Sequence, residues 1–406
     1  MKKIKKQDGF SLTELIVAMS VFLFVIAAAT GMFIPLIRQF KHQSTLAETN
    51  IEGTVGLELL RNDIEHAGYG IPWSFQGSIT YNEAITDPAK NFNDAPHNTP
   101  RAVFSTNNMV FPGPNNIFNG TDYLVIKSTV LGKNNNYTVQ KWSYITAEGK
   151  PRRWGSDDLQ DGEGVIVMRP QAGDTKLKEL IVDGGSFFTT YSSSAFPAAF
   201  SPSRPSEGFL IYGVSPSIPL RMPFNRADYF LHRFDEKGND IVPRRCAQKT
   251  GVLEKVIVNN TLDFEGGKLT NYLTLLDCVA DLQVAFGIDT TSPPDRIIDC
   301  YTNDPGTLLY PADAKNLRDR IRELRLYILS QEGRYDITYT LDLSPHTANL
   351  VPDIGCPTCI RVGEGNARNC SGERIIGRDF DLTTIPDWQH YRWRVYTLVV
   401  RPDNLR

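Results

Sequence analysis

The sequence lacks the signatures of the common catalytic sites. Its 406 residues contain no Gly-x-Ser-x-Gly elbow, no His-Glu-x-x-His pair and no phosphate-binding P-loop. The six histidines are scattered and form no triad by spacing: His42, His66, His97, His232, His346 and His390. The sequence therefore predicts a protein that is not an enzyme and that needs no cofactor.

The chain also lacks a strong excess of either charge. It has 43 basic and 46 acidic residues, for a formal net charge of −3. The arginine pairs at 152–153 and 244–245 are too sparse for a nucleic-acid groove, so we expect no nucleic-acid partner. The acidic cluster at 157–163 lacks the alternating ligands and closing glutamate of a calcium loop, which favours a solvated turn and no metal.

Charge is missing altogether from one stretch near the N-terminus. Leu15 to Ile37 contains no charged residue over 23 positions, which is long enough for a helix to cross a bilayer. Four lysines precede it, at positions 2, 3, 5 and 6. This pattern predicts a single span with its N-terminus in the cytoplasm and the bulk of the chain exported.

The only obvious small-residue cleavage site lies on the unusual side of this stretch. A secretory signal is cut after its apolar region, whereas Gly9 precedes it. Cutting after Gly9 would keep the helix on the mature protein, with Glu14 as a carboxylate at the mouth of the span. An ionisable group there is costly in lipid and is a candidate functional residue; the alternative is that Glu14 lies in the headgroup layer without a role.

The segment Gly9-Phe10-Ser-Leu-Thr-Glu14-Leu15 resembles the class III leader of type IV prepilins and of type II secretion pseudopilins. The resemblance implies cleavage between Gly9 and Phe10 by a prepilin peptidase, followed by N-methylation of Phe10. It also implies that Glu14 pairs with the amino group of Phe10 in a neighbouring subunit, an ion pair that would set the register of assembly. The leader carries four lysines and one aspartate, so its removal takes the formal net charge from −3 to about −6.

Three further segments resemble PilW-type minor pilins of the type IV pilus: residues 60–70, 277–289 and 391–404. This resemblance implies a structural subunit in a tip complex that primes pilus assembly. The implied partners are other minor pilins, the major pilin, the inner-membrane platform protein, the prepilin peptidase and a PilY-type tip adhesin. The implied location is the inner membrane, and the pilus after assembly. Residues 73–268 carry no such signal.

Three alternatives to this function stay open. The first is a type II secretion pseudopilin, which would use the same leader in another machine. The second is an exported adhesin or DNA-uptake receptor that uses the long loops. The third is a membrane-anchored exported enzyme.

The sequence divides into four segments. These are a cleaved leader at 1–9, a membrane or filament-core helix at 10–37, an amphipathic extension at 38–67 and an exported head at 68–406. Gly31 and Pro35 predict a kink or local melting of the helix, unless both are simply tolerated there. Gly53 and Gly56 weaken the helical pattern, and Gly68 predicts its left-handed end. The stripe expected to pack on the head is Phe40, Ala47, Ile51, Val55, Leu59 and Ile64.

The exported head is expected to be rich in strands. β-Branched and aromatic runs predict strands at 121–129, 137–144, 164–168, 180–183, 209–214, 229–234, 320–329, 335–341 and 391–400. A short helix is expected to begin within 311–316. The prediction is an α+β fold, in which one mostly antiparallel sheet packs on the long helix and long loops are inserted.

All six cysteines lie in the second half of the chain: Cys246, Cys278, Cys300, Cys356, Cys359 and Cys370. An even count in an exported segment favours disulfides. We expect one bridge within 356–370, and a bridge from Cys278 to Cys246 or Cys300. The alternatives are a zinc site formed by His346 with Cys356, Cys359 and Cys370, or a redox pair in Cys356-Pro-Thr-Cys359.

A direct measurement distinguishes these states of the cysteines. Intact mass analysis of the exported protein with a thiol-reactive label should detect no free thiol before reduction and six after it. Labelling of two or more cysteines without reductant would instead support the zinc or redox alternative.

Overall fold

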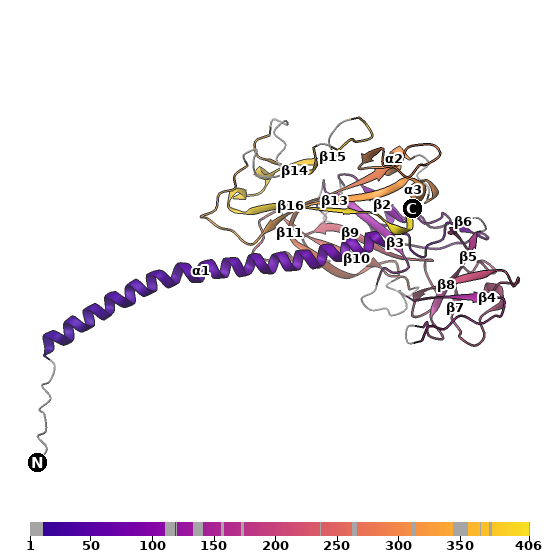
Figure 1. Ribbon diagram of the computed structural model, residues 1–406, viewed down its shortest axis with the longest axis horizontal. Helices are drawn as coiled ribbons and strands as arrows, with labels where there is room; N and C mark the ends of the chain where they lie inside the picture. The colour runs from indigo at the N-terminus through magenta and orange to yellow at the C-terminus, as the bar shows by residue number, and fades with distance from the viewer. Residues whose placement is uncertain are drawn as a thin grey trace, which may run out of the picture. The chain divides into compact units, whose positions relative to one another are not determined.

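The computed structural model describes residues 11–109, 118, 120–132, 141–155, 158–171, 174–235, 237–261, 266–309, 314–343, 356–365, 367–372 and 376–405. The chain divides into two compact units, Met1–Ile51 and Glu52–Arg406. The described part of the first unit is helical, and the second unit contains the head and the last turns of the same helix (Figure 1).

Helix α1 (Leu12–Glu65) contains 54 residues without a break. Its assignment runs through Gly31 and Pro35, so the local melting expected there is absent, while a kink stays a prediction. The weakening expected from Gly53 and Gly56 is also absent. The helix ends where predicted, because Gly68 adopts a φ of 82° that residues with a Cβ rarely tolerate.

The main sheet of the head has eight strands, which pair antiparallel in the order β16-β13-β11-β10-β9-β3-β2, with β12 beside β11. Their bounds are β2 (Val103–Thr106), β3 (Tyr123–Ser128), β9 (Asn225–His232), β10 (Gly251–Val258), β11 (Leu269–Ile288), β12 (Cys300–Thr302), β13 (Ile321–Glu332) and β16 (Arg392–Val400).

The region without a family signal builds a second, six-stranded sheet in the order β1-β6-β5-β8-β4, with β7 beside β5. Its strands are β1 (Ser74–Phe75), β4 (Trp142–Thr146), β5 (Gly164–Gln171), β6 (Asp174–Leu180), β7 (Thr189–Thr190) and β8 (Gly208–Ser215). Figure 1 shows β4, β5, β7 and β8 grouped apart from β11, β13 and β16. The expected α+β class is confirmed, whereas the expectation of one sheet is wrong.

The remaining elements are short. Strands β14 (Cys359–Glu364) and β15 (Ile376–Asp381) form a hairpin-like pair. The helices are α2 (Pro305–Leu308), α3 (Ala314–Arg320), and the 3₁₀ turns η1 (Ala89–Phe92), η3 (Ala198–Phe200), η5 (Leu382–Thr384), η6 (Trp388–His390) and η7 (Asp403–Leu405). Residues 335–341 form no strand, because Asp336 and its neighbours make turns there. The long strand β11 begins eight residues before the segment recognised in the sequence.

The face of α1 that packs on the head is not the predicted one. Val55 is 58% exposed and Leu59 is 45% exposed, whereas Leu57, Leu60 and Ile64 are buried. Of the predicted stripe in this unit, only Ile64 lies in the core. This face packs on the sheet because it includes Gly53 and Gly56, whose lack of a side chain lets the helix come close to the strands.

Gly56 makes that close approach possible. A Cβ placed on it would lie 1.8 Å from the carbonyl oxygen of Leu275 in β11. A Cβ on Gly53 would lie 3.0 Å from the Leu276 side chain. Backbone therefore packs directly on backbone at this point, so these glycines determine which face of the helix turns inward.

A buried ion pair attaches the turn of α1 that contains Asp63 to the main sheet. The Lys255 ammonium lies 2.6 Å from Asp63 Oδ2, and the Tyr229 hydroxyl donates to the same oxygen at 2.7 Å. Burial, with Asp63 beside it, raises the pKa of Tyr229 well above its usual value, so the hydroxyl stays protonated and donates. The Asp63 carboxylate thus joins α1 to β9 and β10.

A second set of buried charged side chains holds the segment 77–101 against strands β3 and β9 of the main sheet. Glu83 lies 2.7 Å from the Lys127 ammonium and 3.0 Å from Arg226, whose Nε donates to Asp228 at 2.7 Å. All four side chains are at most 1% exposed, and each is paired, as buried charges must be. Strands β3 and β9 supply three of them.

We predict that Gly56→Ala destabilises the head by about 1–3 kcal/mol, because the added methyl group overlaps the Leu275 carbonyl. Urea unfolding of the full chain in detergent, followed by tryptophan fluorescence, measures this. Gly77→Ala is the control, since a Cβ there meets no atom within 4 Å. Equal unfolding midpoints for the two variants would contradict the close approach.

We also predict that Asp63→Asn costs about 3–5 kcal/mol, because it leaves the buried Lys255 ammonium without its counter-charge. The double variant Asp63→Asn with Lys255→Met removes both charges and should recover most of that loss. The same unfolding assay gives the coupling energy. Additive effects of the two changes would mean that the pair does not fasten the helix.

Candidate functional site

Glu14 lies in the first turn of α1, where it forms a reciprocal cap with Ser11. The Ser11 amide donates to Glu14 Oε2 at 2.9 Å, and the Glu14 amide donates to Ser11 Oγ at 3.2 Å. This is the capping box that a Ser-x-x-Glu sequence favours. Glu14 is exposed, and its carboxylate uses only part of its capacity to accept hydrogen bonds in this cap. The carboxylate is therefore held in place and can still accept a cation.

The predicted processing residues Gly9 and Phe10 lie outside the residues that the structure describes. The helix beyond them has the properties of a membrane segment. Leu12–Phe33 forms one helix that is long and apolar enough to cross a bilayer, and none of it is buried within the chain. Side chains such as Phe24 and Met32 are each 77% exposed. Within the described part of the first unit, Glu14 is the acidic residue at the entrance of this apolar surface.

The six cysteines form three disulfides: Cys246–Cys278, Cys300–Cys370 and Cys356–Cys359. The two expected features are present, since Cys278 pairs with Cys246 and one bridge lies within 356–370. The first bridge ties the segment before β10 to β11, and the second ties β12 to the segment before β15. These two disulfides therefore link loops of the head covalently to its main sheet.

The zinc alternative loses its thiolate ligands in this arrangement. The redox alternative stays open, because a Cys356–Cys359 disulfide is also the oxidised form of such a pair. The sulfur atoms of Cys356 and Cys359 lie near Asp381, with ligand atoms within 4.8 Å of one another. Both sulfurs are bonded in a disulfide, however, and Asp381 accepts hydrogen bonds from Thr358 and Thr383. His346 lies outside the described residues. This cluster stabilises the turn before β14.

The acidic turn is also satisfied by internal contacts. Asp161 accepts from the Ser193 amide at 2.7 Å, and Glu163 accepts from the Gln160 amide at 2.8 Å. Asp158 accepts from the Trp154 amide and lies 3.5 Å from the Arg153 guanidinium. A turn closed by internal hydrogen bonds therefore accounts for the described carboxylates of this cluster, but Asp158 and Glu163 are buried and not solvated as expected.

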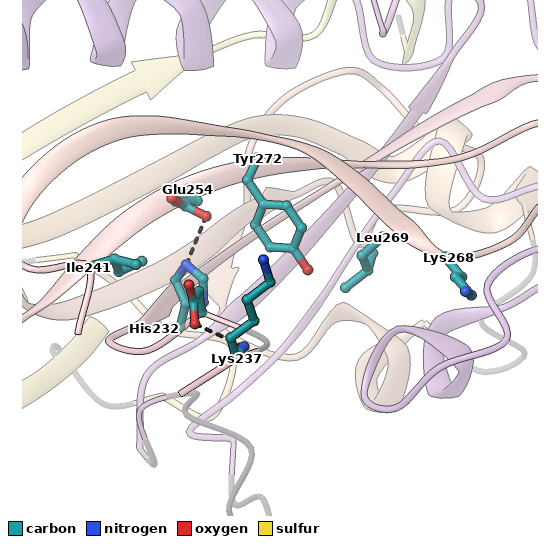
Figure 2. Close-up of a pocket in the computed structure, with 8 residues that line it drawn as sticks. His232, Lys237, Ile241, Glu254, Lys268, Leu269 and Tyr272 are labelled. Carbon is teal, nitrogen blue, oxygen red and sulfur yellow. Dashed lines mark hydrogen bonds and ion pairs between the residues drawn. The ribbon is translucent and has the colours of Figure 1, made fainter. Parts of the chain in front are cut away.

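The head has a cavity of about 470 Å³, which sequence reasoning did not find. Figure 2 shows His232 and Glu254 pointing toward each other, with Tyr272 on one side and Lys237 below. The His232 Nε2 atom lies 2.8 Å from Glu254 Oε2, and the Tyr272 ring stacks on the His232 ring with centroids 5.9 Å apart. Ile241, Leu269 and Lys268 complete the wall.

The carboxylates of Glu254 and Asp235 in this cavity already accept hydrogen bonds from neighbouring residues. Thr274 donates to Glu254, and hydrogen bonds from Asn239 hold the pKa of Asp235 below its usual value. His232 belongs to an aromatic series in which it contacts Phe230, and Phe230 stacks on Tyr123 with centroids 5.1 Å apart. His232 thus lies within a packed aromatic row that continues to Tyr272. No spacing in the sequence relates His232 to Glu254, because they meet only when β9 pairs with β10.

Comparison with known proteins gives one match. The family described as "Prokaryotic N-terminal methylation motif" matches residues 4–30. No curated protein and no solved structure matches the chain. The match covers the segment from the lysine leader through Gly9, Phe10 and Glu14 into the apolar helix.

The motif and the apolar helix together support a type IV pilin-like or pseudopilin-type protein, which is anchored in a membrane and processed by a prepilin peptidase. The structure places Glu14 at the start of that helix and the cysteines in the head. It brings no catalytic set of residues together with Glu14 among the residues described.

Proposed function

We propose that this protein is a minor pilin, a non-catalytic structural subunit of a type IV pilus that acts in a tip complex. The observation that carries the proposal is the combination of the methylation motif at 4–30 with a carboxylate at the start of an otherwise apolar, exposed helix. Such a helix needs either lipid or other helices to cover it.

Assembly by helix packing would give Glu14 a specific partner. When apolar helices pack together, an unpaired carboxylate between them is strongly disfavoured. Cleavage after Gly9 creates a cationic amino group at Phe10, and this group on a neighbouring subunit can neutralise Glu14. Any other stagger between two subunits leaves both charges unmatched, so the pair selects one register.

The last turns of α1 are part of the head. Gly56 and Asp63 fasten the last turns of α1 to β10 and β11. The large head, with two sheets and three disulfides, suits a subunit of low copy number at the tip.

The proposed partners follow from this role. They are the prepilin peptidase, the inner-membrane platform protein, the major pilin, other minor pilins and a PilY-type tip adhesin. Before assembly, the protein would cross the inner membrane once with its N-terminus in the cytoplasm, and after assembly the head would be extracellular.

We predict that Glu14→Gln abolishes incorporation into pili while leaving cleavage of the leader intact. Glutamine keeps the side-chain acceptor for the Ser11 amide, as a capping box allows, but removes the charge. The measurement is an immunoblot of sheared pili and of membranes, from cells that express the variant in place of the native protein.

Ser11→Ala is the matched control, since it removes the opposite half of the cap and leaves the Glu14 charge. It should assemble. If Glu14→Gln subunits entered pili at the native level, the carboxylate would serve only to cap α1, and the ion-pair account would fail. Detection in membranes of native cells, but never in sheared pili, would favour a type II secretion pseudopilin.

A further inference from the structure

The second sheet exposes an aromatic platform that neither the fold nor assembly through α1 requires. Strand β4 is an edge strand of this sheet, paired on one side with β8. Trp142 on β4 is 39% exposed, and Trp154 just beyond it is 50% exposed. Their ring centroids lie 5.2 Å apart at an angle of 51°, so the two indoles form an open corner. Tyr144 meets Trp154 edge-on with centroids 6.0 Å apart.

The platform is held in place by its own backbone. Pro151 bridges to Ile145, and the Arg152 amide donates to the Tyr144 carbonyl at 2.8 Å, which folds the 151–154 segment back on β4. The Trp154 indole donates to the Trp142 carbonyl at 3.1 Å. Rings fixed in this way lose little conformational entropy when they bind a ligand.

The positively charged side chain of Arg152 lies beside the Trp154 ring. The Arg152 guanidinium carbon lies 5.9 Å from the Trp154 ring centroid, and the residue is exposed. In the part of the chain that the structure describes, no carboxylate forms an ion pair with it. The neighbouring Arg153 differs, because it lies 3.5 Å from Asp158. Arg152 is thus positioned to receive an anion next to the aromatic corner.

We infer that this platform binds a glycan that ends in a carboxylate-bearing pyranose. The apolar C–H face of a sugar ring packs on an exposed indole, and the corner between Trp142 and Trp154 offers two such surfaces. Arg152 then pairs with the sugar carboxylate. Two exposed tryptophans side by side are otherwise unfavourable, because they invite non-specific association.

Charge argues against a nucleic-acid strand as the ligand. A single-stranded nucleic acid needs a basic groove that follows its phosphates. Here Asp158 and Asp161 lie in the turn that follows Trp154, and Arg152 is the one guanidinium without a carboxylate partner among the described residues of this segment. A ligand with one carboxylate fits this arrangement better than a polyanion.

The test uses the full chain in detergent and two sugars that differ in one acidic residue, 3′-sialyllactose and lactose. Isothermal titration should show saturable binding of sialyllactose. The affinity for lactose should be lower by about fivefold or more, because only sialyllactose has a carboxylate that can pair with Arg152. Intrinsic tryptophan fluorescence should shift with the same midpoint, since Trp142 and Trp154 are contacted.

Two variants separate the roles of rings and charge. Trp154→Ala should weaken sialyllactose binding by about tenfold or more, because a stacking surface is lost. Arg152→Gln should reduce sialyllactose affinity to the level of lactose, because it removes the positive charge beside the Trp154 ring. The controls are Arg153→Gln, whose guanidinium already has a carboxylate partner, and Phe234→Ala, which removes an exposed ring elsewhere on the head. Both should bind as the native chain does.

The inference fails if sialyllactose does not bind, if it binds no better than lactose, or if the Trp154 and Arg152 variants bind normally. It also fails if oligo-dT or polyglutamate binds as tightly as sialyllactose, since the site would then recognise anions in general. None of these outcomes bears on the assembly proposal, which depends on Glu14 and the helix.

Discussion

An apolar helix surface without a partner in its own chain is the constraint on which the rest depends. Across Leu12–Phe33 no part of α1 is buried, so its stability in water would be poor and its natural surroundings are lipid or other helices. Within such surroundings a single carboxylate at the first turn has a large energetic effect, because an unpaired charge is costly there. Ser11 caps the first turn and holds the Glu14 carboxylate at the start of this apolar surface.

The head depends on the other end of the same helix. The two glycines of the Gly53–Gly56 segment allow the backbone of α1 to approach β11, and Asp63 ties the following turn to β9 and β10. Large apolar side chains, Val55 and Leu59, consequently point away from the head. The inner face of the helix therefore stabilises the fold, while the outer face leaves apolar side chains exposed.

The N-terminal motif could be recognised because its signal is local: a glycine, an aromatic residue and a glutamate at fixed spacing before an apolar run. Strand β3 was also predictable from its run of β-branched and aromatic residues, and the second half of β9 was predicted within 229–234. The helix face was not, because periodicity reports which residues are large and apolar, whereas Gly56 packs through the absence of a side chain. The second sheet, the His232–Glu254 pair and the Trp142–Trp154 corner arise from pairing between distant segments, which no local pattern encodes.

The central claim is that the mature chain begins with the apolar helix itself, its terminal nitrogen available to a neighbour's carboxylate. Mass spectrometry of the N-terminal peptide from protein purified out of native membranes tests this most directly. The account predicts a peptide that begins at N-methylated Phe10, directly before the Ser11–Glu14 cap. A mature protein that retained Met1, or one that had lost α1 through cleavage after Phe33, would contradict it.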